Sequence, residues 1–141
     1  ATLRDLGALR RLEKACFEAD AWPLLDLIAV LTFPAVIRLK AVNAEEEIIG
    51  FIAGDVRASQ NLAWIATLGV LPAYRRRGVG RLLLQTCESM LPVPRVRLSV
   101  RVDNRAAIHL YRQSGYQQVG IWPRYYNGGV DALVMEKELS Q

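Results

Sequence analysis

The sequence is poor in cysteine and has no long apolar run. Two cysteines stand among its 141 residues, Cys16 and Cys87, and neither belongs to a CxxC or Cys/His pattern, which argues against a disulfide framework and a structural zinc site. We therefore expect no bound metal and a reducing compartment, the cytoplasm. The longest apolar stretch, Leu24–Leu39, is interrupted by two charged residues, a threonine and a proline, so no transmembrane helix is predicted. The first residues show no basic patch followed by an apolar segment, so we expect no signal peptide and no membrane partner.

Charge of either sign is not strongly in excess. Lysine and arginine number 18, aspartate and glutamate number 14, and the formal net charge is +4. This small positive excess suits an anionic ligand but is too weak to indicate direct binding of nucleic acid. Apolar residues make up 52% and charged residues 23% of the sequence, and no repeat or linker is visible. We therefore expect one globular domain over residues 1–141.

Hydrophobic periodicity predicts a series of helices and strands. The helices are expected over Leu3–Glu18, Leu24–Leu31, Val79–Met90 and from an Asn104 cap to Ser114. The strands are expected over Ala35–Val42, Ile48–Val56, Leu62–Val70, Arg95–Val102, Tyr116–Trp122 and Asp131–Leu139, the last two joined through Pro123–Val130. This order predicts an α/β fold with a mixed, mostly antiparallel sheet flanked by helices.

Two of these strands have patterns that predict which side chains share a face. In the third predicted strand we expect one face to carry Leu62, Trp64, Ala66, Leu68 and Val70. In the fourth, apolar and polar residues alternate, with Val96, Leu98, Val100 and Val102 on one face and Arg95, Arg97, Ser99 and Arg101 on the other.

A glycine-containing, arginine-rich turn, Arg75–Gly80, lies between the third predicted strand and the helix that begins at Val79. Glycine lets the backbone approach a ligand closely, and the N–H groups at a helix start bind anions. Arginines beside them add positive charge suited to phosphate. The spacing fits neither a P-loop nor a dinucleotide-binding motif, whose third glycine is replaced by Leu83.

The same turn matches the Q/R-x-x-G-x-G/A motif and thereby resembles the GNAT superfamily of N-acetyltransferases. The resemblance implies that acetyl-CoA is the cosubstrate and that Leu68 and Val70 pair their main-chain groups with its pantetheine arm and acetyl carbonyl. It also implies a pyrophosphate site in the turn, formed by Arg75, Arg76, Arg77, Gly78, Val79, Gly80 and Arg81. The strand that usually opens this fold is not found before Leu3. The alternative interpretation of the turn is a basic helix start on a solvated face.

A second motif of the same family, N-x-x-A-x-x-L-Y-x-x-x-G-F/Y, is matched from Asn104 to Tyr116. The resemblance implies that Asn104 contacts the CoA arm and that Tyr111 protonates the departing thiolate, which a phenol with a pKa of about 10 can do at neutral pH. The alternatives are a plain helix cap for Asn104 and a core aromatic for Tyr111. His109, the single histidine, is expected on another face of the helix, without a catalytic role.

The segment from Arg124 to Leu139 is similar to the end of protein N-terminal acetyltransferases, including the bacterial ribosomal-protein-alanine type and its archaeal relatives. The early segment from Leu9 to Phe17 is similar too. The resemblance implies that Tyr125 and Tyr126 line a peptide groove, with Tyr126 favoured, and that Trp22 and Phe17 line its other wall. The alternative is a hairpin whose aromatic side chains pack on the sheet.

One position departs from the family pattern. A glutamate that often stands five residues before the motif asparagine is replaced by Ser99, so the obvious general base is absent. Neutralising an α-amine with a pKa near 7.8 costs only about 0.5 kcal/mol at pH 7.4, against about 4 kcal/mol for a lysine. The sequence therefore favours a protein N-terminal α-amine as the acceptor. Two other functions stay open, namely acetylation of a small-molecule amine and a non-catalytic acyl-CoA-binding module.

Overall fold

The computed structural model describes residues 3–17, 36–75, 77–126 and 128–139. Its helices are α1 (Leu6–Phe17), α3 (Val79–Met90) and α4 (Arg105–Gln113), and its strands are β1 (Val36–Val42), β2 (Ile48–Arg57), β3 (Leu62–Val70), β4 (Arg95–Arg101), β5 (Gln117–Tyr126) and β6 (Val130–Glu138). These bounds confirm the predicted elements to within a few residues, except at the end of β5. The helix expected over Leu24–Leu31 lies outside the described residues. No described helix has the length and apolar character needed to cross a membrane.

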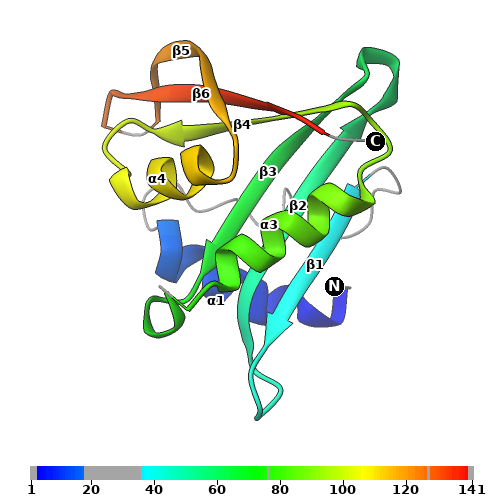
Figure 1. The fold of residues 1–141 in the computed structure, drawn as a ribbon. Coiled ribbons are helices and arrows are strands. Elements are labelled where there is room, and N and C mark those ends of the chain that lie inside the picture. Colours follow the sequence, from blue (N-terminus) through cyan, green and yellow to red (C-terminus); the bar gives the residue numbers. More distant parts are fainter. Residues whose placement is uncertain (1–2, 18–35, 76, 127, 140–141) are drawn as a thin grey trace.

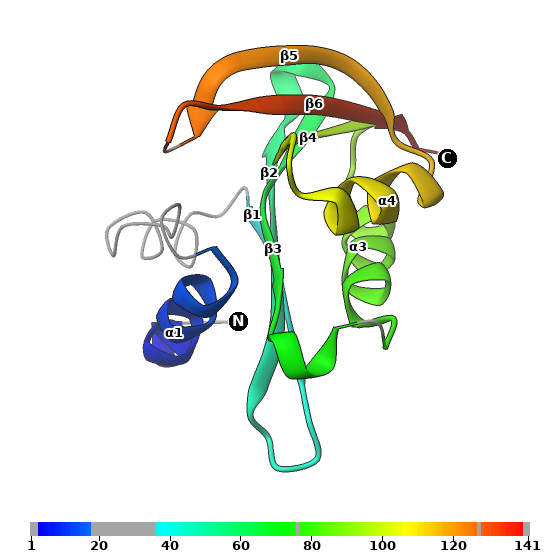
Figure 2. The same cartoon turned by 90° about the vertical axis from the view of Figure 1, so that its left-hand side faces the viewer.

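The six strands form one sheet in the order β1-β2-β3-β4-β6-β5 (Figure 1). All neighbours are antiparallel except β3 and β4, which confirms the mixed, mostly antiparallel sheet. Helix α1 covers one face, whereas α3 and α4 cover the other (Figure 2). The sheet therefore lies between two helical layers, and each layer buries its own apolar cluster.

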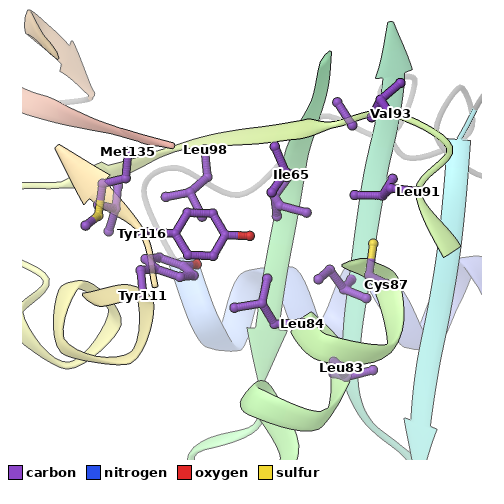
Figure 3. Close-up of a cluster of buried hydrophobic side chains, with 14 of the residues drawn as sticks. Ile65, Leu83, Leu84, Cys87, Leu91, Val93, Leu98, Tyr111, Tyr116 and Met135 are labelled. Carbon is purple, nitrogen blue, oxygen red and sulfur yellow. The ribbon is translucent and has the colours of Figure 1, made fainter. Parts of the chain in front are cut away.

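The larger cluster lies between the sheet and helices α3 and α4 (Figure 3). Helix α3 comes close to β2 because that strand presents glycine beneath it. A Cβ on Gly50 would lie 3.0 Å from Leu83 Cδ1, and one on Gly54 would lie 3.1 Å from Cys87 Sγ. The smaller cluster, under α1, contains Leu9, Leu12, Phe51 and Ala53.

Strand β3 contains a β-bulge that changes which of its side chains share a face. Ala53 pairs with Thr67 and Gly54 pairs with Ile65, so Ala66 is an extra residue in the ladder. Ala63 and Ile65 before the bulge, and Leu68 and Val70 after it, all pack in the cluster below α3. The prediction of a single apolar face from Leu62 to Val70 is therefore wrong, because one extra residue shifts the alternation by one position.

Strands β3 and β4 pair only where they begin, through Ala63↔Val96 and Trp64↔Arg97, and then diverge toward their C-terminal ends (Figure 1). Beyond this point β3 pairs with β2 alone among the described strands. The Leu71 N–H donates to the Ile49 carbonyl at 2.8 Å, on the β2 side. Because main-chain direction alternates along a strand, Leu68 and Val70 turn their N–H and C=O groups toward the diverging side.

Strand β5 runs four residues further than predicted, to Tyr126. Its ladder with β6 is irregular between Trp122 and Tyr126, where Pro123 has no N–H to donate and Arg124 has a φ of 52°. The Asp131 carboxylate accepts the Arg124 N–H at 2.9 Å. This side-chain bond holds an interrupted strand together, so the two tyrosines at its end belong to the sheet and not to a loop.

Candidate functional site

The turn after β3 leads into an uncapped helix start. A 3-10 turn, Pro72–Tyr74, follows the strand, and α3 begins after Gly78, which has a φ of 80°. Gly78 is the N-cap residue of α3 and has no side chain that could cap the helix. The first intrahelical hydrogen bond runs from the Leu82 N–H to the Gly78 carbonyl at 3.0 Å. The N–H groups of the first turn of α3 thus have no side-chain cap, which is the arrangement that binds anions.

Arginines brace this turn and leave other donors for a ligand. Arg75 Nε donates to the Val70 carbonyl at 3.0 Å, and the Arg77 guanidinium lies 5.4 Å from the Tyr74 ring centroid. Arg81 Nη2 donates to Gln113 Oε1 at 2.9 Å and so links α3 to the end of α4. Each guanidinium has five N–H donors, so these contacts use only part of its capacity. Arg76 lies outside the described residues.

Residues of the second sequence motif, Asn104–Tyr116, form the start and the end of α4. Asn104 Oδ1 accepts the Ala107 N–H at 3.2 Å and caps the start. At the other end Gly115 has a φ of 99°, and the Tyr116 N–H bonds to the Tyr111 carbonyl at 3.0 Å, as in a Schellman motif. The two tyrosine rings pack with centroids 5.7 Å apart (Figure 3). The cap at Asn104 and the core position of Tyr111 are therefore confirmed.

Tyr111 is buried, with 7% of its surface exposed. Burial, and secondarily the nearby Tyr126, raise the pKa of its phenol above the ordinary value, so it stays protonated throughout the physiological range. Tyr126 OH lies 3.1 Å from Ser99 Oγ, and the Arg101 guanidinium is 5.8 Å from the Tyr126 ring centroid. The hydroxyl groups of Ser99 on β4 and Tyr126 on β5 thus meet beside the divergence of β3 and β4.

Two carboxylates near Ser99 are already occupied. Glu136 Oε1 lies 2.8 Å from Arg97 Nε, and Asp103 Oδ1 lies 3.1 Å from Arg101 Nε. The hydrogen bond from Arg101 lowers the pKa of the Asp103 carboxyl, which makes it a weaker base. The alternation predicted for β4 is confirmed for Val96, Leu98 and Val100, which lie in the core opposite the polar residues. It is wrong for Val102, which lies beyond the end of the strand and is 42% exposed.

A continuous row of aromatic side chains ends at the Ser99–Tyr126 pair. Ring centroids are 5.6 Å apart for Trp64 and Trp122, 5.0 Å for Trp122 and Tyr125, and 5.0 Å for Tyr125 and Tyr126. We call these four residues the aromatic row. Sequence reasoning named only the tyrosines, because the Trp64–Trp122 contact joins strands far apart in the chain. Trp22 lies outside the described residues, and the side chain of Phe17 is not described.

One cavity lies elsewhere, on the flank of α4 that faces β5. Arg105, Ile108, His109 and Arg112 of α4 line it together with Ile121 of β5. It contains none of the predicted site residues, and His109 is exposed there, on another face of the helix from Tyr111.

A polar network joins α3 to β6 and to Tyr116, the residue before β5. Tyr116 OH donates to Glu88 Oε2 at 2.7 Å, and Lys137 Nζ donates to Glu88 Oε1 at 2.9 Å. The neighbouring Cys87 is a free, buried thiol, and burial raises its pKa to about 12. These groups hold the fold around Tyr111, and the thiol is unreactive at neutral pH.

Comparisons with known proteins agree with this architecture. N-alpha-acetyltransferase RimI of Mycobacterium tuberculosis is 45% identical over 75 residues, which are 52% of this chain and 48% of that protein. The N-terminal acetyltransferase A complex catalytic subunit ard1 of Schizosaccharomyces pombe is 32% identical over 143 residues, 98% of this chain and 76% of that protein. The solved ribosomal-protein-S18-alanine N-acetyltransferase from Escherichia coli matches with a TM-score of 0.88 at 26% identity, over 100% of this chain and 92% of that one.

The chain combines a mixed sheet that divides between β3 and β4 with an uncapped helix start beside the division. The sequence model of the acetyltransferase (GNAT) family matches residues 6–116, and the chain belongs to that family. It spans less than half the length of two mycobacterial relatives that it matches, at 39% and 48% of them.

Proposed function

We propose that this protein transfers the acetyl group of acetyl-CoA directly to a protein or peptide N-terminal α-amine. The amine nitrogen attacks the thioester carbonyl, and the C–N bond forms as the C–S bond breaks. The nitrogen releases a proton to water, and the departing sulfur takes up a proton. One observation carries this proposal: the Ser99 and Tyr126 hydroxyl groups meet beside the divergence of β3 and β4, next to an uncapped helix start. The names of the N-terminal acetyltransferases among the relatives support the choice of acceptor.

Acetyl-CoA fits between the end of β3 and the starts of α3 and α4. The first-turn N–H groups of α3 suit its pyrophosphate, and the main-chain groups that β3 turns away from β2 suit its pantetheine arm and acetyl carbonyl. A Cβ on Gly80 would lie 3.7 Å from Val70 Cγ2 and 3.5 Å from Leu110 Cδ2, so these three elements meet there. The residues assigned to acetyl-CoA are Leu68, Val70, Arg75, Arg76, Arg77, Gly78, Val79, Gly80, Arg81 and Asn104.

Tyr111 is assigned as the acid that protonates the CoA sulfur. Its raised pKa keeps the phenol in the protonated form that an acid requires. The Schellman motif and the ring contact with Tyr116 hold the side chain in place. The structural role of Tyr111 and the proposed catalytic role therefore depend on the same packing.

The acceptor amine meets hydroxyl groups in place of a carboxylate base. Ser99 and Tyr126 can orient the amine or a water molecule, but neither hydroxyl is a strong base. An α-amine is about 30% neutral at pH 7.4, so neutralising it costs only about 0.5 kcal/mol, whereas neutralising a lysine would cost about 4 kcal/mol. The Ser99–Tyr126 pair therefore supports a preference for α-amines, with Tyr125 and Tyr126 beside the peptide and Trp22 assigned to the other wall.

Binding is tested first, by thermal melts with acetyl-CoA and with NAD and ATP as controls. A ligand at a hundred times its dissociation constant adds about 2.7 kcal/mol, which shifts the melting temperature by several degrees. The acceptor is then tested by mass spectrometry on a peptide that has a free N-terminus and an internal lysine, beside its N-formylated twin. We expect acetylation of the first peptide at the α-amine, at a rate that rises with pH as that amine loses its proton.

Two results would contradict the proposal. Acetylation of a polyamine or another small amine, with both peptides unmodified, would indicate a small-molecule acetyltransferase. Binding of acetyl-CoA without turnover of any amine would indicate a non-catalytic acyl-CoA-binding module.

A further inference from the structure

The aromatic row brings together two strands that the sheet order keeps apart. Strands β4 and β6 lie between β3 and β5, and neighbouring strands are about 4.8 Å apart, so β3 and β5 would be about 14 Å apart in a flat sheet. The Trp64 and Trp122 ring centroids are nevertheless only 5.6 Å apart. Strand β5 therefore bends over the sheet, and Figure 2 shows the β5–β6 hairpin reaching toward the side that carries α1.

Specific features of the backbone produce this bend. The β5–β6 ladder is irregular between Gln118 and Gly120 and again between Trp122 and Tyr126. Such irregularities bend the strand that contains the extra residues and change the direction of its side chains. On the opposite strand, Trp64 pairs in parallel register with Arg97, so its side chain lies on the face of β4 that carries Ser99. The aromatic row thus lies over the polar face of β4.

The aromatic row leaves a large apolar surface uncovered next to the Ser99–Tyr126 pair. Trp122 is 38% exposed and Tyr125 is 57% exposed, although a sheet edge usually carries polar side chains. Nearby arginines are partly offset by carboxylates, since Arg95 and Arg97 share Glu136 and Arg101 pairs with Asp103. The side chains of the aromatic row are themselves uncharged, so the surface that they expose is apolar and aromatic.

Resting on the proposed function, we propose that the aromatic row selects acceptor proteins by the residues that follow the modified N-terminus. The ring centroids are 5.0 Å apart both for Tyr126 and Tyr125 and for Tyr125 and Trp122, so Tyr126 and Trp122 are at most about 10 Å apart. An extended chain of about three residues has this length. An amine held at Tyr126 therefore places the second and third acceptor residues beside Tyr125 and Trp122. The preferred acceptor has a large apolar or aromatic side chain at one of these positions.

The test compares peptides that differ only at positions 2 and 3, which carry phenylalanine, leucine, serine, aspartate or lysine. Burying one large apolar side chain is expected to raise kcat/KM about ten- to hundredfold over the serine peptide. In Trp122→Ala this preference should fall to less than threefold, through the KM for the peptide, with the KM for acetyl-CoA unchanged. The matched control is Ile121→Ala, an equally exposed neighbour on β5 that lines the cavity beside α4. It should keep the full preference.

Several outcomes would overturn the proposal. A wild-type enzyme that acetylates all five peptides equally, or that prefers the lysine or aspartate peptide, excludes apolar selection by the aromatic row. So does Trp122→Ala with an unchanged preference. If Trp122→Ala does not fold, Tyr125→Ala removes the more exposed ring and should weaken the same preference; retention of the preference there also overturns the proposal. If acetyl-CoA binds but no peptide is modified, the proposed function fails, and the selection fails with it.

Discussion

The positive φ of Gly78 provides a sharp test of how the helix start is built. A residue with a Cβ in the left-handed region pays about 1–2 kcal/mol, whereas asparagine tolerates this conformation better than alanine does. A Cβ at Gly78 would meet nothing within 4 Å, so size is not limiting there. We therefore expect Gly78→Ala to be more destabilising than Gly78→Asn, although asparagine is the larger residue.

The expected magnitudes follow from the local geometry. For a domain of this size, 1 kcal/mol corresponds to about 3–5 °C in melting temperature, so Gly78→Ala should melt about 3–10 °C below the wild type. Gly78→Asn should lose about half as much. The control is Gly80→Ala, whose Cβ would make ordinary contacts of 3.5 Å with Leu110 and 3.7 Å with Val70. Alanine favours a helix over glycine by up to about 1 kcal/mol, so this variant should be neutral or slightly more stable.

The assay is a thermal melt of each variant with and without acetyl-CoA. Strain at Gly78 displaces the first-turn N–H groups, so the shift produced by acetyl-CoA should also shrink in Gly78→Ala. If Gly78→Asn melts at or below Gly78→Ala, the positive φ is not what requires glycine. If Gly78→Ala keeps the full acetyl-CoA shift, the helix start is not the anion site.

Three further predictions concern the tyrosine acid, the buried network and the thiol. Tyr111→Phe should lower kcat at least tenfold and leave the acetyl-CoA thermal shift intact; an unchanged kcat in steady-state assays would remove Tyr111 from the chemistry. Glu88→Gln weakens two charge-assisted bonds on a side chain that is 8% exposed, and chemical denaturation should show a loss of about 2–3 kcal/mol. The control Asp55→Asn, in an exposed ion pair, should cost less than about 1 kcal/mol. Burial raises the pKa of Cys87 from 9.0 to about 12. As the pH rises above 9, the thiol therefore ionises in the unfolded chain before it ionises in the folded protein. The free energy of unfolding should therefore fall between pH 9 and 12, and less steeply in Cys87→Ala; equal slopes would contradict this.

Local patterns were sufficient to predict most of the elements and one face of the sheet. The observed helix over Val79–Met90 and the strand over Leu62–Val70 have the predicted bounds, because their periodicity and their flanking glycine and proline are local signals. The alternation in Arg95–Arg101 also holds, since that strand pairs without a register shift. The Asn104 cap depends on contacts within a few residues of the chain and was predicted for that reason.

Long-range pairing decided the features that local patterns missed. The bulge at Ala66 depends on how β3 aligns with β2, and nothing in the order of side chains along β3 marks the extra residue. The extension of β5 to Tyr126 depends on a bond from Asp131 of the next strand. Both were mispredicted because a period of two assumes an unbroken ladder.

The sequence by itself determined the family, the helix start that suits an anion and the replacement of a carboxylate by Ser99, because each depends on residues close together in the chain. Only the tertiary structure decided that Ser99 bonds Tyr126 and that Trp64 meets Trp122. These contacts join residues from different strands and helices, and the bend of β5 and the divergence of β3 from β4 set their distances. Such geometry arises from the packing of the whole sheet, and no local pattern encodes it.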